Sequence, residues 1–180
     1  MAHPAARFSV FVGQQLVGRG DLLAAATAAH ACGQDLPLVL DDASGQPVDL
    51  NLQGSAFDVT NRFAPDEEPP KVGRGRPKLG VVAREVTLLP RHWDWLAGQS
   101  GGASAALRRL VEQARRDDGG ATELRTTQER VYRAMTALGG DLPGYEEATR
   151  ALFAADRDRF RQLIKSWPKD VALYLLDLGS

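Results

Sequence analysis

Residues 81–116 read VVAREVTLLPRHWDWLAGQSGGASAALRRLVEQARR, and this stretch dominates the interpretation of the chain. Its first nine residues, 81–89, are rich in β-branched and other apolar residues, which predicts a strand. Pro90 closes that strand and suits the first turn of a helix, because its missing N–H would be unpaired there in any case. A short helix is therefore expected over residues 91–99.

A second helix is expected after the break at Ser100-Gly101-Gly102, over residues 103–116. One apolar face of a helix is indicated by residues at i, i+3, i+4 and i+7, and these are Leu107, Leu110, Val111 and Ala114. The stretch is predicted to be one strand followed by two helices.

This segment resembles the ribbon-helix-helix family of bacterial DNA-binding proteins, through AREVTLLP at residues 83–90 and GGAS at residues 101–104. The resemblance implies that two chains pair their strands into an antiparallel ribbon that enters the major groove, and that the second helices form the core of the homodimer. It also implies that backbone N–H groups of Gly102, Ala103 and Ser104 bind a DNA phosphate at the positive end of a helix.

The register of the expected ribbon is open, because a slip of one residue exchanges the two faces of a strand. In one register Arg84 faces the bases, and in the other Glu85 and Thr87 do, with glutamate accepting from cytosine. The base-facing set is either Leu88, Val86 and Arg84, counted back from Pro90, or Leu89, Thr87 and Glu85.

An alternative interpretation makes the same segment a strand and helical hairpin inside a single-chain core. Trp93, Trp95 and Leu96 suit that interpretation, since tryptophans usually bury a large apolar area. The charged residues of the second helix then form only a solvated face.

A basic arm precedes the strand: Lys71-Val72-Gly73-Arg74-Gly75-Arg76-Pro77-Lys78. Its Arg-Gly-Arg-Pro core resembles the AT-hook, a peptide that binds the minor groove of A·T-rich DNA. Gly75 admits the backbone into a groove about 6 Å wide, and Pro77 keeps the arm extended. The resemblance places Arg74 and Arg76 on the groove floor, and Lys71 and Lys78 on flanking phosphates. The alternative is a solvated, charged linker.

The remaining segments complete an α+β chain. Residues 1–60 are expected to form a small ββαββ unit, with strands near residues 8–12, 16–17, 36–40 and 48–52 and a helix over residues 22–31 capped by Asp21. Residues 61–80 form a linker that carries the arm, and residues 81–118 the ribbon-helix-helix-like segment. Helices are expected in residues 119–180, near 122–138, 145–154, 156–165 and 169–178.

Nearly the whole chain is also similar to a bacterial family known as domain of unknown function 2239. The phrases that carry this similarity are GRPKLGVVAREVTLLPRHW at residues 75–93, GDLPG at residues 140–144 and SWP at residues 166–168. The similarity implies that the arm and the strand belong to one unit, and it implies no activity.

Composition excludes several classes of protein. With 22 Lys plus Arg against 23 Asp plus Glu, the formal net charge is −1, so a uniformly basic nucleic-acid coat is excluded and any contact with DNA must be local. A single cysteine, Cys32, excludes an internal disulfide framework. No run approaches the length needed to cross a bilayer, and no signal-peptide pattern opens the chain, so a cytoplasmic protein at the nucleoid is expected.

The sequence contains no recognisable catalytic or metal-binding pattern. His3, His30 and His92 have no metal-like partners at i+3 or i+4, and Cys32 has no nearby base. No nucleophile elbow or phosphate-binding glycine loop is present. We therefore expect no enzyme activity, no cofactor and no metal.

The combined expectation is a homodimeric bacterial DNA-binding protein, either a transcriptional regulator or a nucleoid-associated factor. Its ribbon engages the major groove and its arm the A·T-rich minor groove. The alternative is a protein-interaction adaptor that binds no nucleic acid, with the arm serving only as a linker.

Overall fold

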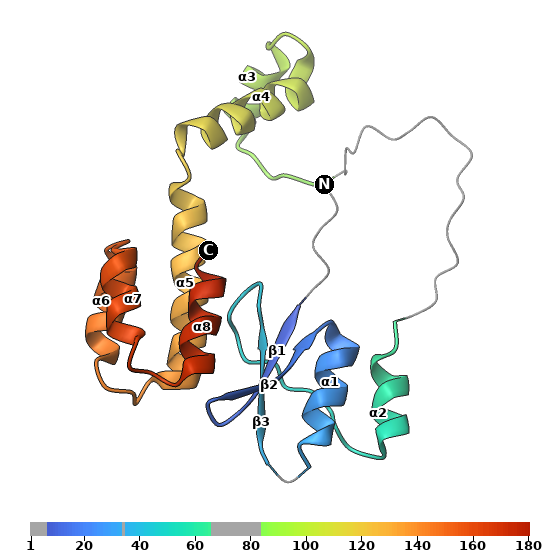
Figure 1. Cartoon of the computed structure of the whole chain (residues 1–180). Coiled ribbons are helices and arrows are strands. Elements are labelled where there is room, and N and C mark those ends of the chain that lie inside the picture. Colours follow the sequence, from blue (N-terminus) through green and yellow to red (C-terminus); the bar gives the residue numbers. More distant parts are fainter. Residues whose placement is uncertain (1–6, 34, 66–83) are drawn as a thin grey trace. The chain divides into compact units, whose positions relative to one another are not determined.

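The computed structural model describes residues 7–33, 35–65 and 84–180, and divides the chain into two compact units (Figure 1). Residues Met1–Asp66 and Glu123–Ser180 form the first unit, and Glu67–Thr122 the second. The N-terminal α+β segment and the C-terminal helices, which the sequence analysis treated separately, thus belong to one unit. The expected mixed α+β class is confirmed.

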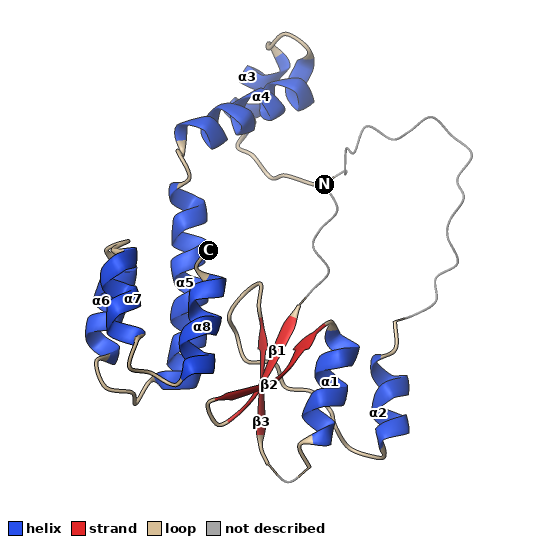
Figure 2. Ribbon diagram, in the orientation of Figure 1, coloured by secondary structure: helices blue, strands red, loops and turns tan. Residues whose placement is uncertain are grey.

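The first unit contains a three-stranded antiparallel sheet (Figure 2) in the order β2-β1-β3, with β1 at Phe8–Val12, β2 at Gln15–Gly20 and β3 at Pro37–Asp41. Helix α1, at Leu22–Ala31, begins where Asp21 accepts a hydrogen bond from the backbone N–H of Ala24 at 2.9 Å. The expected cap, helix and first three strands are confirmed.

The strand periodicity distributes the apolar side chains of the sheet between two separate cores. Val10 and Val39 are buried in a small core with Ala25 and Ala29 of α1. Their neighbours in sequence, Phe11 and Leu40, point to the opposite face, because successive side chains of a strand alternate. These two residues belong to a larger core built with the C-terminal helices.

Helix α1 lies directly on β2 because the contact is made by very small residues. A Cβ atom added to Gly18 would lie 2.5 Å from the Cβ of Ala28, and one added to Gly20 would lie 2.7 Å from the Cβ of Ala24. Both distances are too short for real carbon atoms, so glycine is required in β2 at this helix–sheet spacing.

The larger core lies between the sheet and four helices: α5 at Ala121–Gly139, α6 at Tyr145–Phe153, α7 at Arg157–Ile164 and α8 at Lys169–Leu178. Asp156 caps α7 by accepting from the N–H of Arg159 at 3.0 Å. Buried residues come from the sheet and from all four helices, and include Phe11, Leu40, Val131, Met135, Ala148, Phe160, Ile164, Val171, Tyr174 and Leu175.

A polar cluster joins the sheet to α8 inside this interface. The hydroxyl of Tyr174 donates to Oδ1 of Asp42 at 2.9 Å, and Nε of Arg19 donates to Oδ2 at 3.0 Å. The same guanidinium pairs with Asp177 at 2.5 Å. Burial, and then the negative charge of Asp42, raise the pKa of Tyr174 well above its usual value. The phenol therefore stays protonated and keeps its hydrogen bond to the carboxylate.

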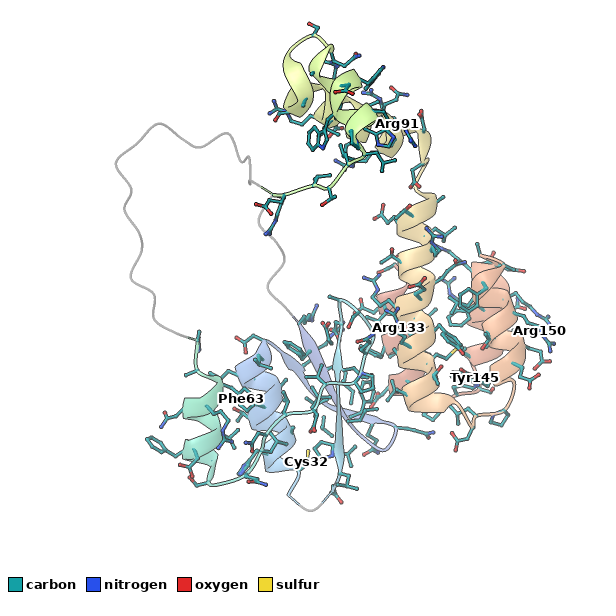
Figure 3. The ribbon with its side chains drawn as sticks, turned by 180° about the vertical axis from the view of Figure 1, so that it is seen from behind. Cys32, Phe63, Arg91, Arg133, Tyr145 and Arg150 are labelled. Atoms are coloured by element: carbon teal, nitrogen blue, oxygen red, sulfur yellow. The ribbon has the colours of Figure 1, made fainter. Side chains whose placement is uncertain are left out.

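The turn after β3 packs closely against the backbone of α5. Gly45 has a φ of 70°, and a Cβ atom there would lie 2.0 Å from the carbonyl oxygen of Arg130. Arg133, labelled on α5 in Figure 3, donates from Nη1 to the carbonyl oxygen of Ser44 at 3.2 Å. Only glycine permits both the left-handed conformation and the close approach.

Two expectations for residues 46–65 were wrong. Residues 48–52 form no strand: Pro47 makes one isolated bridge to Leu40, and the carbonyl oxygens of Asn51 and Gln53 accept from Arg62 instead of from a neighbouring strand. Helix α2, at Ala56–Phe63, was not expected.

The capping box that starts α2 was the missed sequence signal. The side chain of Ser55 accepts from the N–H of Asp58, and the carboxylate of Asp58 accepts from the N–H of Ser55. The hydroxyl of Ser55 also donates to the carboxylate of Asp58 at 2.7 Å. This bond, and then the bond from the N–H of Ser55, lower the pKa of Asp58.

None of the helices in the described ranges combines the length and the apolar character needed to span a membrane.

The Tyr174→Phe substitution is expected to lower the free energy of unfolding by about 1.5–3 kcal/mol, the usual value for a hydrogen bond to a charged group. Urea denaturation measures this. The control is Tyr132→Phe, at a tyrosine that is 37% exposed and whose substitution should change stability by less than about 0.5 kcal/mol. Equal effects of the two substitutions would contradict the structural role of the Tyr174–Asp42 bond.

The Ala155→Gly substitution is expected to raise the free energy of unfolding by about 0.5–1 kcal/mol. Ala155 has a φ of 56°, in the left-handed region where a Cβ atom is unfavourable. Ala154, next to it, has a φ of −76°, so Ala154→Gly should have the opposite sign. Thermal unfolding of the two variants tests this, and a loss of stability in both would refute it.

Candidate nucleic-acid interface

The second unit contains two helices, α3 at Pro90–Ala97 and α4 at Gly102–Asp117. Leu89 is the N-cap of α3, and its carbonyl oxygen accepts from the N–H groups of His92 and Trp93. Pro90 occupies the first turn, as expected from the sequence. Both helices were predicted to within two residues at each end.

Two glycines in left-handed conformations make the turn between α3 and α4. Gly101 and Gly102 have φ values of 84° and 72°. A Cβ atom at Gly101 would lie 2.9 Å from the Cβ of Ala105, so the turn is closed tightly onto α4. Nη1 of Arg109 also donates to the carbonyl oxygen of Ser100 at 2.9 Å. These contacts therefore define the conformation of the turn between α3 and α4.

The three residues predicted to bind a phosphate, Gly102, Ala103 and Ser104, form the first turn of α4. The N–H of Gly102 is already used, because it donates to the carbonyl oxygen of Gln99 at 2.9 Å. No side chain caps α4, and the first amides of a helix lack acceptors within the helix. The amides of Ala103 and Ser104 are thus better placed than that of Gly102 to hold an anion.

The four arginines of α4 are all exposed. Arg108 and Arg109 donate to backbone oxygens of Ser104 and Ser100, while Arg115 and Arg116 contact Glu112 and Gln113 on their own helix. Both members of the Arg115–Glu112 pair are more than 60% exposed. Such surface pairs are weak, so these guanidinium groups can exchange their contacts for phosphates at little cost.

Most of the apolar side chains of the second unit are uncovered. In its described part only Leu96 and Ala106 are buried. Trp93 is 40% exposed and Trp95 is 54% exposed, so they do not form the single-chain core that was the alternative expectation. The other large apolar side chains that are exposed in this unit are Val86, Leu89, Leu110 and Val111.

The strand predicted over residues 81–89 is absent from its described part, and this expectation was wrong for the single chain. Residues 84–89 have no regular structure, since a strand needs a neighbouring strand to pair with. Arg84, Glu85 and Thr87 are all exposed there. Residues 81–83 lie outside the described residues, as do all members of the predicted arm, namely Lys71, Arg74, Gly75, Arg76, Pro77 and Lys78.

The described residues also contain chemistry that the sequence did not reveal. Asp42 and Tyr174 are 132 positions apart and meet in the first unit. His30 bonds through Nε2 to the carbonyl oxygen of Gly54, and Cys32 donates to the carbonyl oxygen of Ala28. No group of three or more potential metal ligands occurs among the described residues.

Of the three comparisons with known proteins, one found a match. A search of the curated proteins and a search of the solved structures found no match for this chain. A family model does match, over residues 7–179, and therefore covers both units. Because the match spans nearly the whole chain, the chain belongs to the family DUF2239, described as an uncharacterized protein conserved in bacteria.

Proposed function

We propose that this protein is a homodimeric bacterial DNA-binding protein, a transcriptional regulator or nucleoid-associated factor, that acts through its second unit. In this proposal a ribbon made by two copies of residues 83–89 enters the major groove. The arm at residues 71–78 reaches the adjacent minor groove of A·T-rich DNA. The proposal assigns the protein a binding role and no catalytic step, and places it at the nucleoid.

The observation that carries the proposal is the uncovered apolar surface of α3 and α4. A helical hairpin that buries only Leu96 and Ala106 has too little apolar contact to be stable by itself. Leu110 and Val111 are 48% and 55% exposed on the face of α4 that the sequence periodicity makes apolar. A second copy of the chain carries the same apolar surface. The two surfaces can pack against each other across a twofold axis.

Residues 84–89 add a second reason to choose another copy of this chain as the partner. They include the β-forming residues Val86 and Thr87 but have no regular structure in the single chain. Antiparallel pairing with the same residues of a second copy would satisfy the backbone groups of both. Arg84, Glu85 and Thr87 are exposed and are the candidates for reading base edges.

The positively charged groups of α4 favour binding of a polyanion such as DNA. Arg108, Arg109, Arg115 and Arg116 lie on α4, and their contacts within the chain are exposed and weak. The positive N-terminal end of α4, with the amides of Ala103 and Ser104, favours a phosphate. Dimerisation doubles each of these contacts, which strengthens binding without any additional residue.

The Val111→Asp substitution is expected to weaken dimerisation at least about tenfold, because it places a charge in an apolar contact. Sedimentation equilibrium of the full chain measures this. Leu173→Asp is the matched control, since Leu173 is also 55% exposed but lies on α8 of the first unit. A wild-type protein that stays monomeric at about 100 μM would refute the homodimer.

The Arg74→Ala plus Arg76→Ala double substitution is expected to weaken binding to an A·T-rich duplex by about tenfold or more, and to reduce the salt dependence of the binding constant. Fluorescence anisotropy at several salt concentrations measures both. Arg150→Ala plus Arg159→Ala removes the same charge from the exposed surface of the first unit and should have little effect.

Unchanged binding in the Arg74 and Arg76 variant would remove the arm from the mechanism. A wild-type dimer with no duplex affinity at physiological salt would refute DNA binding altogether, and would favour the protein-interaction adaptor.

A further inference from the structure

A cavity of about 160 Å³ lies within the helical layer of the first unit. All four helices of that layer contribute to its wall, with Val131 from α5, Leu152 from α6, Phe160 from α7 and Leu175 from α8. Its lining residues all belong to the first unit, and none of them is assigned to DNA. Its function is therefore a question independent of the proposal above.

This cavity is mainly apolar, opens to solvent on one side and has the size of one ring. Val131, Phe160 and Leu175 are buried core residues that form part of its wall. An apolar cavity of about 150 Å³ stays dry and holds a benzene molecule in another protein. A cavity of this volume and lining can therefore take a single aromatic ring, but not a nucleotide or a peptide.

One polar side chain in the wall is held in a fixed orientation. Gln128 is only 9% exposed, and its Nε2 donates to the carbonyl oxygens of Leu152 and Phe153 at 2.7 and 3.3 Å. Both bonds use the amide nitrogen, so Oε1 accepts no hydrogen bond from the described residues. An amide oxygen in this position can accept from a hydroxyl group on a bound ring.

Two arginines at the rim supply positive charge. Arg157 and Arg161 line the cavity and are four residues apart on α7, which places them on the same face of the helix. Arg161 has one ion pair, a 4.0 Å contact with Asp158 in which both side chains are mostly exposed. The side chain of Arg157 has no ion-pair or hydrogen-bond partner among the described residues. Two such guanidinium groups match the geometry of a carboxylate.

Asp156 reduces this positive charge without cancelling it, because the rim holds one carboxylate and two guanidinium groups. The carboxylate of Asp156 accepts from the N–H of Arg159 at the start of α7. Ala155, also in the wall, has the only positive φ of any non-glycine residue in the described ranges. Backbone strain of this kind is retained where the surrounding structure requires it. Gly179 and Ser180 complete the rim.

We propose that this cavity is a binding site for a small aromatic monocarboxylate. The ring packs between Leu152, Phe160 and Leu176, which line the cavity and keep some accessible surface, and the carboxylate pairs with Arg157 and Arg161 at the rim. A hydroxyl group on the ring opposite the carboxylate donates to Oε1 of Gln128. Benzoate is thus the minimal ligand, and 4-hydroxybenzoate is expected to bind more tightly.

Calorimetric titration of the full-length protein with benzoate, 4-hydroxybenzoate and the neutral analogue benzyl alcohol tests the proposal. Benzoate should bind with a dissociation constant of about 1 mM or lower, and benzyl alcohol at least about tenfold more weakly. Arg157→Gln plus Arg161→Gln should reduce benzoate affinity by about tenfold or more and leave benzyl alcohol unchanged. These side chains are at the surface, so the variant is expected to fold.

The matched control is Arg150→Gln plus Arg159→Gln, which removes the same charge from exposed positions that do not line the cavity. A second variant, Gln128→Leu, should abolish the advantage of 4-hydroxybenzoate over benzoate. Amide chemical shifts of residues around Val131 and Leu175 should move on titration. The proposal is overturned if benzoate shows no saturable binding up to about 10 mM, if the Arg157 and Arg161 variant binds it normally, or if the shifts map outside the cavity.

Discussion

The first unit depends on the need to bury both faces of one small sheet. The face that carries Val10 and Val39 is covered by α1, which lies next to it in the sequence. The other face carries Phe11 and Leu40 and is covered by helices that follow about a hundred residues later. The rings of Phe11 and Tyr174 meet edge to face at 5.1 Å across this contact. Both ends of the chain are therefore required for one core.

This requirement makes the second unit an insertion between the two halves of the first. Insertions of this kind are tolerated because the core of the host unit does not depend on them. The inserted helices α3 and α4 contribute no residue to the larger core and leave Trp95 and Val111 more than half exposed. Apolar surface on a part with so little core of its own is typical of an interaction site. This is the physical basis for proposing that the insertion is the interacting part of the chain.

The two proposals concern different units and rest on different physics. Dimerisation and DNA binding follow from uncovered apolar residues and weakly paired arginines on α4. The proposed carboxylate site follows from a mainly apolar cavity, the fixed amide of Gln128 and the arginines of α7. Val131 and Leu175 serve both the core and the cavity wall, so ligand binding and the stability of the first unit are thermodynamically linked.

The sequence alone was sufficient to predict features that depend on residues within about four positions of each other. Asp21 was correctly expected to cap α1, and Gly101-Gly102 to separate α3 from α4. The same local rules contained the capping box of α2, at Ser55 and Asp58, which was overlooked.

Only the tertiary structure decided which elements share a core. Nothing local distinguishes Asp42 as the partner of Tyr174, since the two are 132 residues apart. Within the strand expected over residues 48–52, Val48 donates to the carbonyl oxygen of Val39 in β3, whereas the carbonyl oxygen of Asn51 accepts from Arg62. The cavity of α5–α8 likewise exists only once four helices have packed. Periodicity and caps act along the chain, whereas pairing, burial and enclosed volume depend on segments that meet only in three dimensions.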